Sequence, residues 1–170
     1  MSATAPTPAA VTTDLPTIQA LAAPDMQAVD ALIRHRLASD VLLINQVAEH
    51  IVSRGGRIGV IGQGEPALEA AMADLGRRHR GRIGVHIGFN ESDARRLYAG
   101  SDFLLMPSRF EPCGLSQMYA QRYASLPIAR CTGGLADTIE DGVSGFLFDA
   151  PCAAAYRQAI DRALQIGRAS

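Results

Sequence analysis

The 170-residue chain contains no lysine and no tryptophan, and its 16 positively charged side chains are all arginine. The absence of lysine excludes Schiff-base chemistry, a P-loop lysine and a lysine general base. The three cysteines, Cys113, Cys131 and Cys152, have no metal-ligand spacing, so we expect reduced thiols in a cytoplasmic protein. No apolar run approaches the roughly 20 residues of a membrane span, and the N-terminus lacks the features of a secretory signal.

The charges nearly cancel, with 16 basic and 17 acidic side chains and a net charge of −1. This balance argues against nucleic acid or an anionic membrane as the main partner. The hydrophobic content of 48% is typical of a globular chain, and 170 residues allow one domain with a core. The histidines share no metal-site spacing, and we expect neither a metal nor a cofactor; they are His35, His50, His79 and His86.

The chain divides into three segments by composition and periodicity. Residues 1–24, rich in Pro, Thr and Ala, are expected to form a disordered arm. Residues 25–56 form the second segment, in which apolar residues recur at three- and four-residue steps and end at Gly55-Gly56. This pattern predicts two helices, or one kinked helix, over residues 25–54. Residues 57–170 form the third segment.

In the third segment, short apolar runs alternate with helical patterns, which predicts an α/β domain with a parallel sheet. The predicted strands are 57–62, 83–88, 103–106, 126–130 and 145–148. The predicted helices are 65–80, 91–100, 114–124 and 153–166.

Ligands of such sheets bind beyond the carboxyl ends of the strands, so the loops there are candidate sites. In the first loop, Gly62 and Gly64 would let the backbone approach a ligand, although an ordinary turn explains them equally well. In the second loop, Phe89 could stack on a flat ring, although packing in the core is the more frequent role of an aromatic residue.

The third loop, residues 107–115, has more candidate functional groups than the other three. Glu111 could stabilise a cationic transition state or bind sugar hydroxyls, and the alternative is a surface ion pair with Arg109. The backbone amides of Gly114, Leu115 and Ser116 could hold a phosphate at the start of a helix.

The fourth loop, residues 130–135, again places glycines at the start of a helix, and the alternative is a turn with no ligand.

Four stretches of the chain carry a family resemblance: GQGEPALEAA (62–71), GRIGVHIGF (81–89), AGSDFLLMPSRFEPCGLSQMYA (99–120) and TGGLADTIEDGVSGFLF (132–148). With them, residues 57–164 resemble the C-terminal nucleotide-binding domain of bacterial glycogen synthases and plant starch synthases. The resemblance implies an incomplete Rossmann-like parallel sheet, the C-terminal half of a GT-B glycosyltransferase. It also implies transfer of glucose from ADP-glucose to an α-1,4-glucan with retention of configuration and without a metal.

The same resemblance suggests roles for individual residues. Glu111 matches the glutamate of the Glu-Pro-Cys-Gly-Leu loop, which has a central catalytic role in the family. Phe89 matches a position, usually Tyr, that stacks on adenine. The other residues expected to bind substrate are Gly62, Gly64, Ser108, Arg109, Cys113, Gly114, Leu115, Ser116, Thr132, Gly133 and Gly134. Ser116 departs from the family, which usually has Thr there.

Residues 15–56 resemble a different family, the N-terminal helices of bacterial trans-polyprenyl diphosphate synthases of the octaprenyl type. In that family Lys-Arg-x-Arg-Pro follows the Gly-Gly, whereas Arg57-Ile58-Gly59 follows it here. The Asp-Asp-x-x-Asp motifs that carry magnesium in that family are absent, so this remnant would have no prenyl-transfer chemistry. The chain therefore resembles a fusion of two pieces joined at Gly55-Gly56.

The resemblance to glycogen and starch synthases favours a glycosyltransferase fragment that is inactive alone, because the acceptor domain and an Arg/Lys motif that neutralises the diphosphate in that family have no counterpart here. The alternative is a non-catalytic module that binds nucleotide weakly or self-associates. We expect ADP-glucose or ADP to bind weakly. The apolar face that includes Val41, Ile44, Val47 and Ile51 is expected to cover the sheet, within one chain or between two chains of a homodimer.

Overall fold

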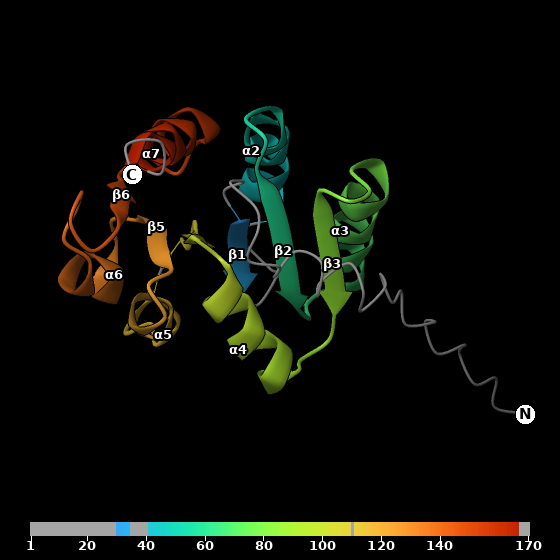
Figure 1. The fold of residues 1–170 in the computed structure, drawn as a ribbon, viewed down its shortest axis with the longest axis horizontal. Helices are drawn as coiled ribbons and strands as arrows, with labels where there is room; N and C mark the ends of the chain where they lie inside the picture. Colours follow the sequence, from blue (N-terminus) through green and yellow to red (C-terminus); the bar gives the residue numbers. More distant parts are fainter. Residues whose placement is uncertain (1–29, 35–40, 110, 167–170) are drawn as a thin grey trace, which may run out of the picture.

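Six parallel strands form one sheet with helices on both faces (Figure 1). The structure, a computed structural model, describes residues 30–34, 41–109 and 111–166. The strands are β1 (Asp30–Arg34), β2 (Arg57–Gly62), β3 (Ile83–Ile87), β4 (Phe103–Met106), β5 (Leu126–Arg130) and β6 (Phe146–Phe148). The helices are α2 (Val41–Ser53), α3 (Pro66–Arg78), α4 (Glu91–Gly100), α5 (Ser116–Arg122), α6 (Gly133–Thr138) and α7 (Ala153–Ile166).

The strand order across the sheet is β3-β2-β1-β4-β5-β6, and every pairing is parallel. β1 lies between β2 and β4, with Ile33 opposite Val60 and Leu32 opposite Leu104. The chain therefore builds outward from β1 in one direction through β2 and β3, and then returns to the other side of β1 with β4.

The structure corrects the helix predicted over residues 25–54. Residues 30–34 form the strand β1, and among the described residues of that range the helix is α2, Val41–Ser53. The three-residue apolar run Ala31-Leu32-Ile33 fits a short buried strand as well as a helical turn, so its periodicity could not decide between them. The sheet makes this segment a strand, because β1 lies between β2 and β4 and pairs with both. Without it, the facing backbone groups of β2 and β4 would have no hydrogen-bond partner.

The other predicted elements agree with the structure to within a few residues. The predicted strands correspond to β2 through β6, and the predicted helices to α3, α4, α5 and α7. The N-terminal arm, residues 1–24, lies outside the described residues.

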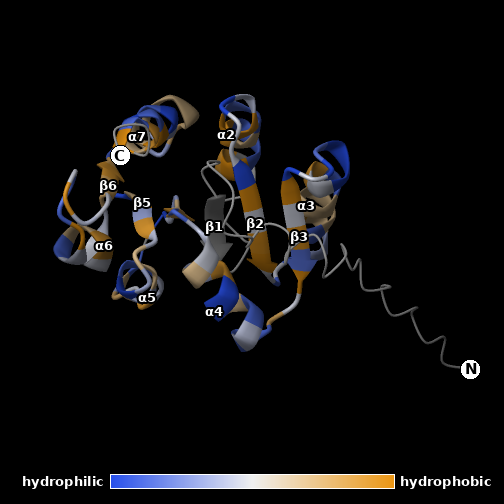
Figure 2. Ribbon diagram, viewed as in Figure 1, coloured by the Kyte–Doolittle hydropathy of each residue, from blue (hydrophilic) through white to orange (hydrophobic). Residues whose placement is uncertain are grey.

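Two apolar cores lie on the two faces of the sheet. On one face α2, α3 and α7 pack on the strands, and on the other face α4, α5 and α6 do so (Figure 1). Figure 2 colours the same view by hydropathy: apolar residues are frequent in the coloured strands, and polar residues are frequent on the helices that cover them. Successive strand residues serve opposite cores; Leu104 belongs to one and Leu105 to the other. The sheet is thus buried on both sides, as its parallel pairing requires.

Helix α2 covers its part of the sheet within the same chain. Ile44, Val47 and Ile51 are at most 1% exposed and belong to the core that α2 shares with α7, α3 and β2. The expected cover is therefore confirmed for these three side chains, and it needs no second chain. Val41 begins α2, but its side chain lies outside the described part.

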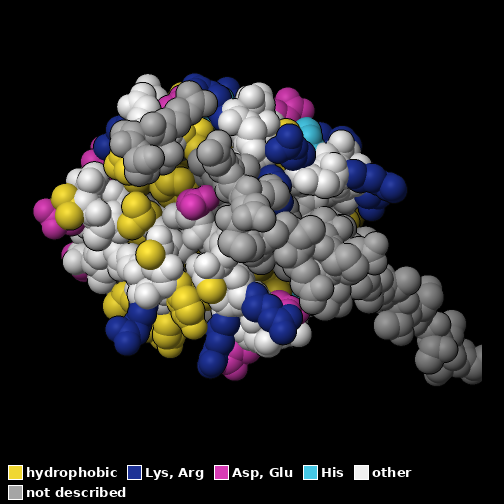
Figure 3. Space-filling view, viewed as in Figure 1, with side chains coloured by type: hydrophobic (Ala, Val, Ile, Leu, Met, Phe, Trp, Pro, Cys, Tyr) yellow, Lys and Arg dark blue, Asp and Glu magenta, His cyan; other side chains and the backbone are white. Residues whose placement is uncertain are grey.

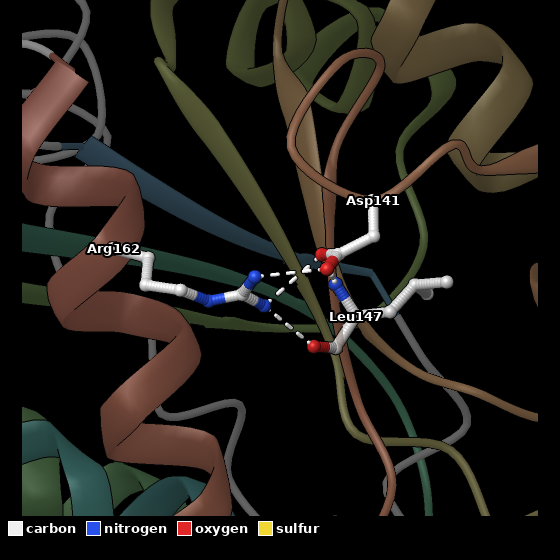
Figure 4. Close-up of polar contacts among 3 residues, drawn as sticks. All are labelled: Asp141, Leu147 and Arg162. Atoms are coloured by element: carbon white, nitrogen blue, oxygen red, sulfur yellow. Dashed lines mark hydrogen bonds and ion pairs between the residues drawn. The ribbon is translucent and has the colours of Figure 1, made fainter.

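The last strand is fastened to the last helix by one arginine. Arg162 of α7 donates two hydrogen bonds to the Asp141 carboxylate, at 2.8 and 3.0 Å, and a third to the Leu147 carbonyl at 2.7 Å (Figure 4). The Leu147 N–H donates to the same carboxylate at 2.7 Å. The Arg162 guanidinium lowers the pKa of Asp141 below its ordinary value, mainly by hydrogen bonding.

Within the described ranges, no helix has the length and apolar character needed to cross a bilayer.

Candidate functional site

The strand order places a crevice at the carboxyl ends of β1 and β4. The connections leaving these two neighbouring strands run in opposite directions, one toward β2 and the other toward β5. In open parallel sheets, such a switch point is where ligands bind. The loop after β4 contains Glu111, so the third candidate loop, residues 107–115, lies at this crevice. The loop after β1 is residues 35–40, outside the described part.

The loop after β4 is held against the start of α6. The Gly134 N–H donates to the Glu111 carbonyl at 2.9 Å, and this bond joins the third and fourth candidate loops. The approach is too close for a larger residue, because a Cβ on Gly134 would lie 2.8 Å from the Cys113 carbonyl carbon. Gly133 has a φ of +46°, and a Cβ there would meet the Glu111 backbone. The two glycines are therefore required by the packing of these loops.

A buried glutamine ties the same loop to α5 and α6. Gln117, fully buried in the first turn of α5, donates from Nε2 to the Cys113 carbonyl at 3.2 Å and to Thr138 Oγ1 at 3.0 Å. Thr138 in turn donates to the Gly134 carbonyl at 2.6 Å. These bonds hold the backbone that follows Glu111 against α5 and α6 and so help to preorganise the loop.

The side chains of this loop differ in exposure. Ser108 is buried, Glu111 is half-buried and Arg109 is exposed. The Arg109 carbonyl accepts a hydrogen bond of 2.7 Å from Nη1 of Arg130, the last residue of β5. A half-buried carboxylate on a fixed backbone can meet a ligand while keeping its orientation, which is what the expected role of Glu111 requires.

At the start of α5, Gly114 is buried, whereas Leu115 and Ser116 are more exposed. Gly114 has a φ of +60°, and Leu115 precedes the helix without a side-chain cap. The first amides of a helix have no partner within it and attract anions. Leu115 is 57% exposed and Ser116 is half-buried, so this turn is open to a ligand.

The first and second candidate loops also meet. The Gly88 N–H donates to the Gly62 carbonyl at 2.8 Å, which joins the ends of β3 and β2. Gly64 donates to Glu69 Oε1 at 2.8 Å, so this loop folds back on α3. The Phe89 side chain is 62% exposed, which favours a stacking surface over a place in the core. The structure thus forms two joined pairs of loops, on opposite sides of β1.

Sequence reasoning missed three supporting residues of the site: Gln117, Arg130 and Thr138. A polar glutamine at a helix position that faces the core was a signal for Gln117, because a buried amide needs partners. Arg130 ends a buried strand, where a charged residue needs a specific contact. Thr138 carries no comparable sequence signal.

Among the described residues, no group of three or more His, Cys, Asp or Glu side chains could hold a metal.

Comparisons with known proteins agree on one family. The sequence profile "Glycosyl transferases group 1" matches residues 31–165, which includes β1 and α2. The chain is 69% identical over 120 residues to the glycogen synthase of Pseudomonas syringae pv. syringae, a match that covers 71% of this chain and 25% of the relative. It is 67% identical over 124 residues to the glycogen synthase of Pseudomonas fluorescens, covering 73% and 24%.

Solved structures agree with the sequence matches. The catalytic domain of starch synthase IV from Arabidopsis thaliana, bound to ADP and acarbose, has a TM-score of 0.82 and 26% identity. That match covers 91% of this chain and 36% of the plant domain. Sucrose-phosphate synthase from Thermosynechococcus elongatus, at 21% identity and a TM-score of 0.69, shares the fold. The chain spans about a quarter of the length of the curated relatives it matches. It belongs to the group 1 glycosyltransferases, and its α/β sheet has the fold of a GT-B glycosyltransferase domain.

Proposed function

We propose that the chain is the nucleotide-sugar-binding part of a glycogen synthase, which uses ADP-glucose to extend an α-1,4-glucan. The observation that carries the proposal is the loop around Glu111, held by Gly134 and Gln117 at the switch point of the sheet. The high identity to the Pseudomonas glycogen synthases supports the choice of reaction. The plant neighbour, which was solved with ADP, supports the choice of nucleotide.

The proposal gives each part of the site one task. Phe89 stacks on the adenine, and the amides of Gly114, Leu115 and Ser116 hold the diphosphate. The Glu111 carboxylate faces the glucose, where its negative charge would stabilise the positive charge that develops as the bond to the diphosphate breaks. Thr132, Gly133 and Gly134 line the sugar and the diphosphate. Ser108, Arg109, Cys113, Gly62 and Gly64 complete the substrate contacts.

The 170 residues transfer no glucose by themselves in this proposal. Departure of a diphosphate needs several positive charges and a closed, water-free cleft. The chain has no lysine, and the structure offers one wall of such a cleft. Each missing charge contact typically costs about 10² to 10³ in rate. The enzyme would act in the cytoplasm, and the α-glucan acceptor would be held by parts of the enzyme outside these residues.

The resemblance of residues 15–56 to polyprenyl diphosphate synthases remains a proposal about the origin of that segment. It carries no activity, because the magnesium-binding aspartate motifs are absent from the sequence. The glycosyltransferase profile begins at residue 31, inside the segment. In the folded chain, the segment supplies β1 and α2 to the glycosyltransferase sheet.

Isothermal titration of the chain with ADP tests the proposed function. We expect a Kd on the order of 1 mM, because stacking and helix amides act without a lysine or a second domain. Phe89→Ala should weaken ADP binding by about tenfold. The matched control is Val143→Ala, which removes another exposed apolar side chain, 68% exposed, from the turn before β6. Absence of saturable ADP binding, or equal binding by the Phe89 variant, would contradict the proposal.

A further inference from the structure

Helix α5 carries a polar side chain on the face where an apolar one is expected. Gln117 is 0% exposed, whereas Met118 and Tyr119 of the same helix are 39% and 50% exposed. Figure 3 shows hydrophobic side chains gathered at the surface over α5. A helix on the surface of a domain normally buries its apolar side chains and exposes its polar ones. The burial of Gln117 therefore needs a specific physical reason.

The hydrogen bonds of Gln117 use only one end of its amide. Nε2 donates to the Cys113 carbonyl at 3.2 Å and to Thr138 Oγ1 at 3.0 Å. Oε1 is buried and accepts no hydrogen bond from the described residues. A buried amide oxygen without a donor lowers the stability of the fold, and an apolar side chain of the same shape would avoid that loss. The two donated bonds, and not the filling of the core, therefore account for a glutamine at this position.

The bond to the Cys113 carbonyl sets the direction of the next amide group. The Cys113 C=O and the Gly114 N–H belong to one peptide unit, which is planar and trans, so the two groups point in opposite directions. Because Gln117 holds the carbonyl toward α5, the Gly114 N–H points away from Gln117. No backbone carbonyl of the described residues accepts from this N–H.

The Gln117 amide also packs directly on Gly114. A Cβ at Gly114 would lie 2.8 Å from Nε2 and would also meet Oε1. The Gly114 φ of +60° lies in the region that favours glycine. Nε2 cannot move aside without losing its two hydrogen bonds. The amide thus fixes both the position and the direction of the Gly114 backbone.

The second bond of Gln117 extends this constraint to the fourth loop. Thr138 Oγ1 accepts from Gln117 Nε2 and donates to the Gly134 carbonyl at 2.6 Å. Hydrogen bonds that follow one another in this way strengthen each other. Gln117 therefore also sets the separation between Gly114 in the third loop and Gly134 in the fourth, the two backbone segments that the proposed function places at the diphosphate.

We propose that Gln117 is a positioning residue for the diphosphate of the nucleotide sugar. It aims the Gly114 N–H at the phosphate oxygens and holds the loop of Gly133 and Gly134 at the matching distance. The identity of the ligand rests on the proposed function, whereas the direction and the order of the Gly114 N–H depend on no ligand. Glutamine suits this task because its amide offers two donors without a charge, and an ionised glutamate of the same length offers none.

Relaxation of the backbone amide nitrogens in NMR spectra of the ligand-free chain tests the structural part. Gln117→Met keeps the length of the side chain and removes both donors. We expect the order parameter of the Gly114 amide to fall from about 0.85 to below about 0.6. The matched control is Gln121→Met, because Gln121 lies one turn later in α5 and donates to the carbonyls of Thr138 and Ser144, at 3.3 and 3.1 Å. This control should leave the Gly114 amide rigid.

Calorimetric titration with ADP tests the consequence for binding. Gln117→Met should weaken ADP binding by about tenfold, as the loss of one hydrogen bond to a charged group does. Gln121→Met should bind ADP within about twofold of the wild type, although each variant should lower the melting temperature by about 2–4 °C. Thr138→Val should weaken ADP binding by about threefold, and Thr138→Ser, which keeps the hydroxyl, should bind within about twofold of the wild type.

Two results would overturn the proposal: a Gly114 amide that stays rigid in Gln117→Met, or a loss of ADP affinity in Gln121→Met equal to that in Gln117→Met. If Gln117→Met does not fold, equal ADP affinities of Thr138→Val and Thr138→Ser would overturn it instead. ADP binding that Gln117→Met leaves unchanged would reject the role of Gln117 alone. Absence of ADP binding by the wild type would reject the proposed function, and the diphosphate role of Gln117 with it.

Discussion

Gly134→Ala gives the sharpest test of how the candidate site is built. Helix propensity alone predicts a gain, because alanine is better than glycine inside a helix by about 1 kcal/mol. Packing predicts a loss. The added Cβ would lie 2.8 Å from two backbone atoms of Cys113, its carbonyl carbon and its Cα, and these cannot rotate away as a side chain can. Ordinary contact distances require the two backbones to separate by about half an ångström or more.

This separation has a cost that can be estimated. Overpacking of a rigid contact typically costs about 1–3 kcal/mol, and loss of the 2.9 Å hydrogen bond from Gly134 to the Glu111 carbonyl adds about 0.5–1.5 kcal/mol. The gain in helix propensity offsets part of these two costs. We therefore expect Gly134→Ala to lower the free energy of unfolding by about 1–3 kcal/mol. For a chain of this size the melting temperature should fall by about 3–10 °C. ADP binding should also weaken, because Glu111 and the start of α5 would shift.

Gly76→Ala is the matched control for this variant. Gly76 lies in α3 far from the site, and a Cβ there would lie 3.2 Å from a methyl group of Val85, which can move slightly. We expect a change in the free energy of unfolding within about 1 kcal/mol and unchanged ADP binding. Urea denaturation and thermal melts measure both variants. If Gly134→Ala proved as stable as the wild type and bound ADP equally, the account of the loop contact would be wrong.

Two further predictions concern stability away from the site. Ile51→Ala should cost about 2–5 kcal/mol in the free energy of unfolding, because Ile51 is 1% exposed in the core beneath α2, whereas Ile166→Ala, at a 50% exposed position, should cost less than about 1 kcal/mol; equal urea midpoints would show that α2 contributes little. Asp141→Asn should cost at most about 1 kcal/mol at pH 7, because the carboxylate and Arg162 are both more than 40% exposed. Arg162 lowers the pKa of Asp141, so the contribution is present above the ordinary pKa of aspartate and is lost as the pH falls through the lowered value. The wild type and the variant should therefore converge as the pH falls through the lowered pKa, and a difference in the free energy of unfolding that does not shrink in acid would contradict this reading.

The sequence predicted the strands and helices after Arg57 because each carries its own local signals. In Arg57–Gly62, an apolar run follows Arg57 and ends in glycine, and Glu91–Gly100 follows the N-cap Asn90, whose side chain accepts from the Asp93 N–H. Such signals are independent of tertiary contacts. β1 lacks them, since its apolar run of three residues, Ala31-Leu32-Ile33, becomes a strand through its neighbours in the sheet.

In the candidate site, too, features that depend on neighbouring residues in the sequence could be predicted, whereas contacts between distant segments could not. The position of Glu111 after a strand predicted that it would lie at the carboxyl edge of the sheet, and the structure has it there. The contact of its backbone with Gly134 depends on two loops separated by more than 20 residues, which no local pattern encodes.

The most direct test of the central claim is to map ADP binding residue by residue through backbone amide shifts in NMR spectra. The account predicts that ADP shifts the amides of Phe89, Gly114, Leu115, Ser116 and Gly134, all at the carboxyl edge of the sheet. Amides at the opposite edge, such as those of Gly55 and Gly81, should not move. Shifts confined to that opposite edge, or no shifts at ADP concentrations of about 10 mM, would contradict the claim that this edge is a nucleotide site.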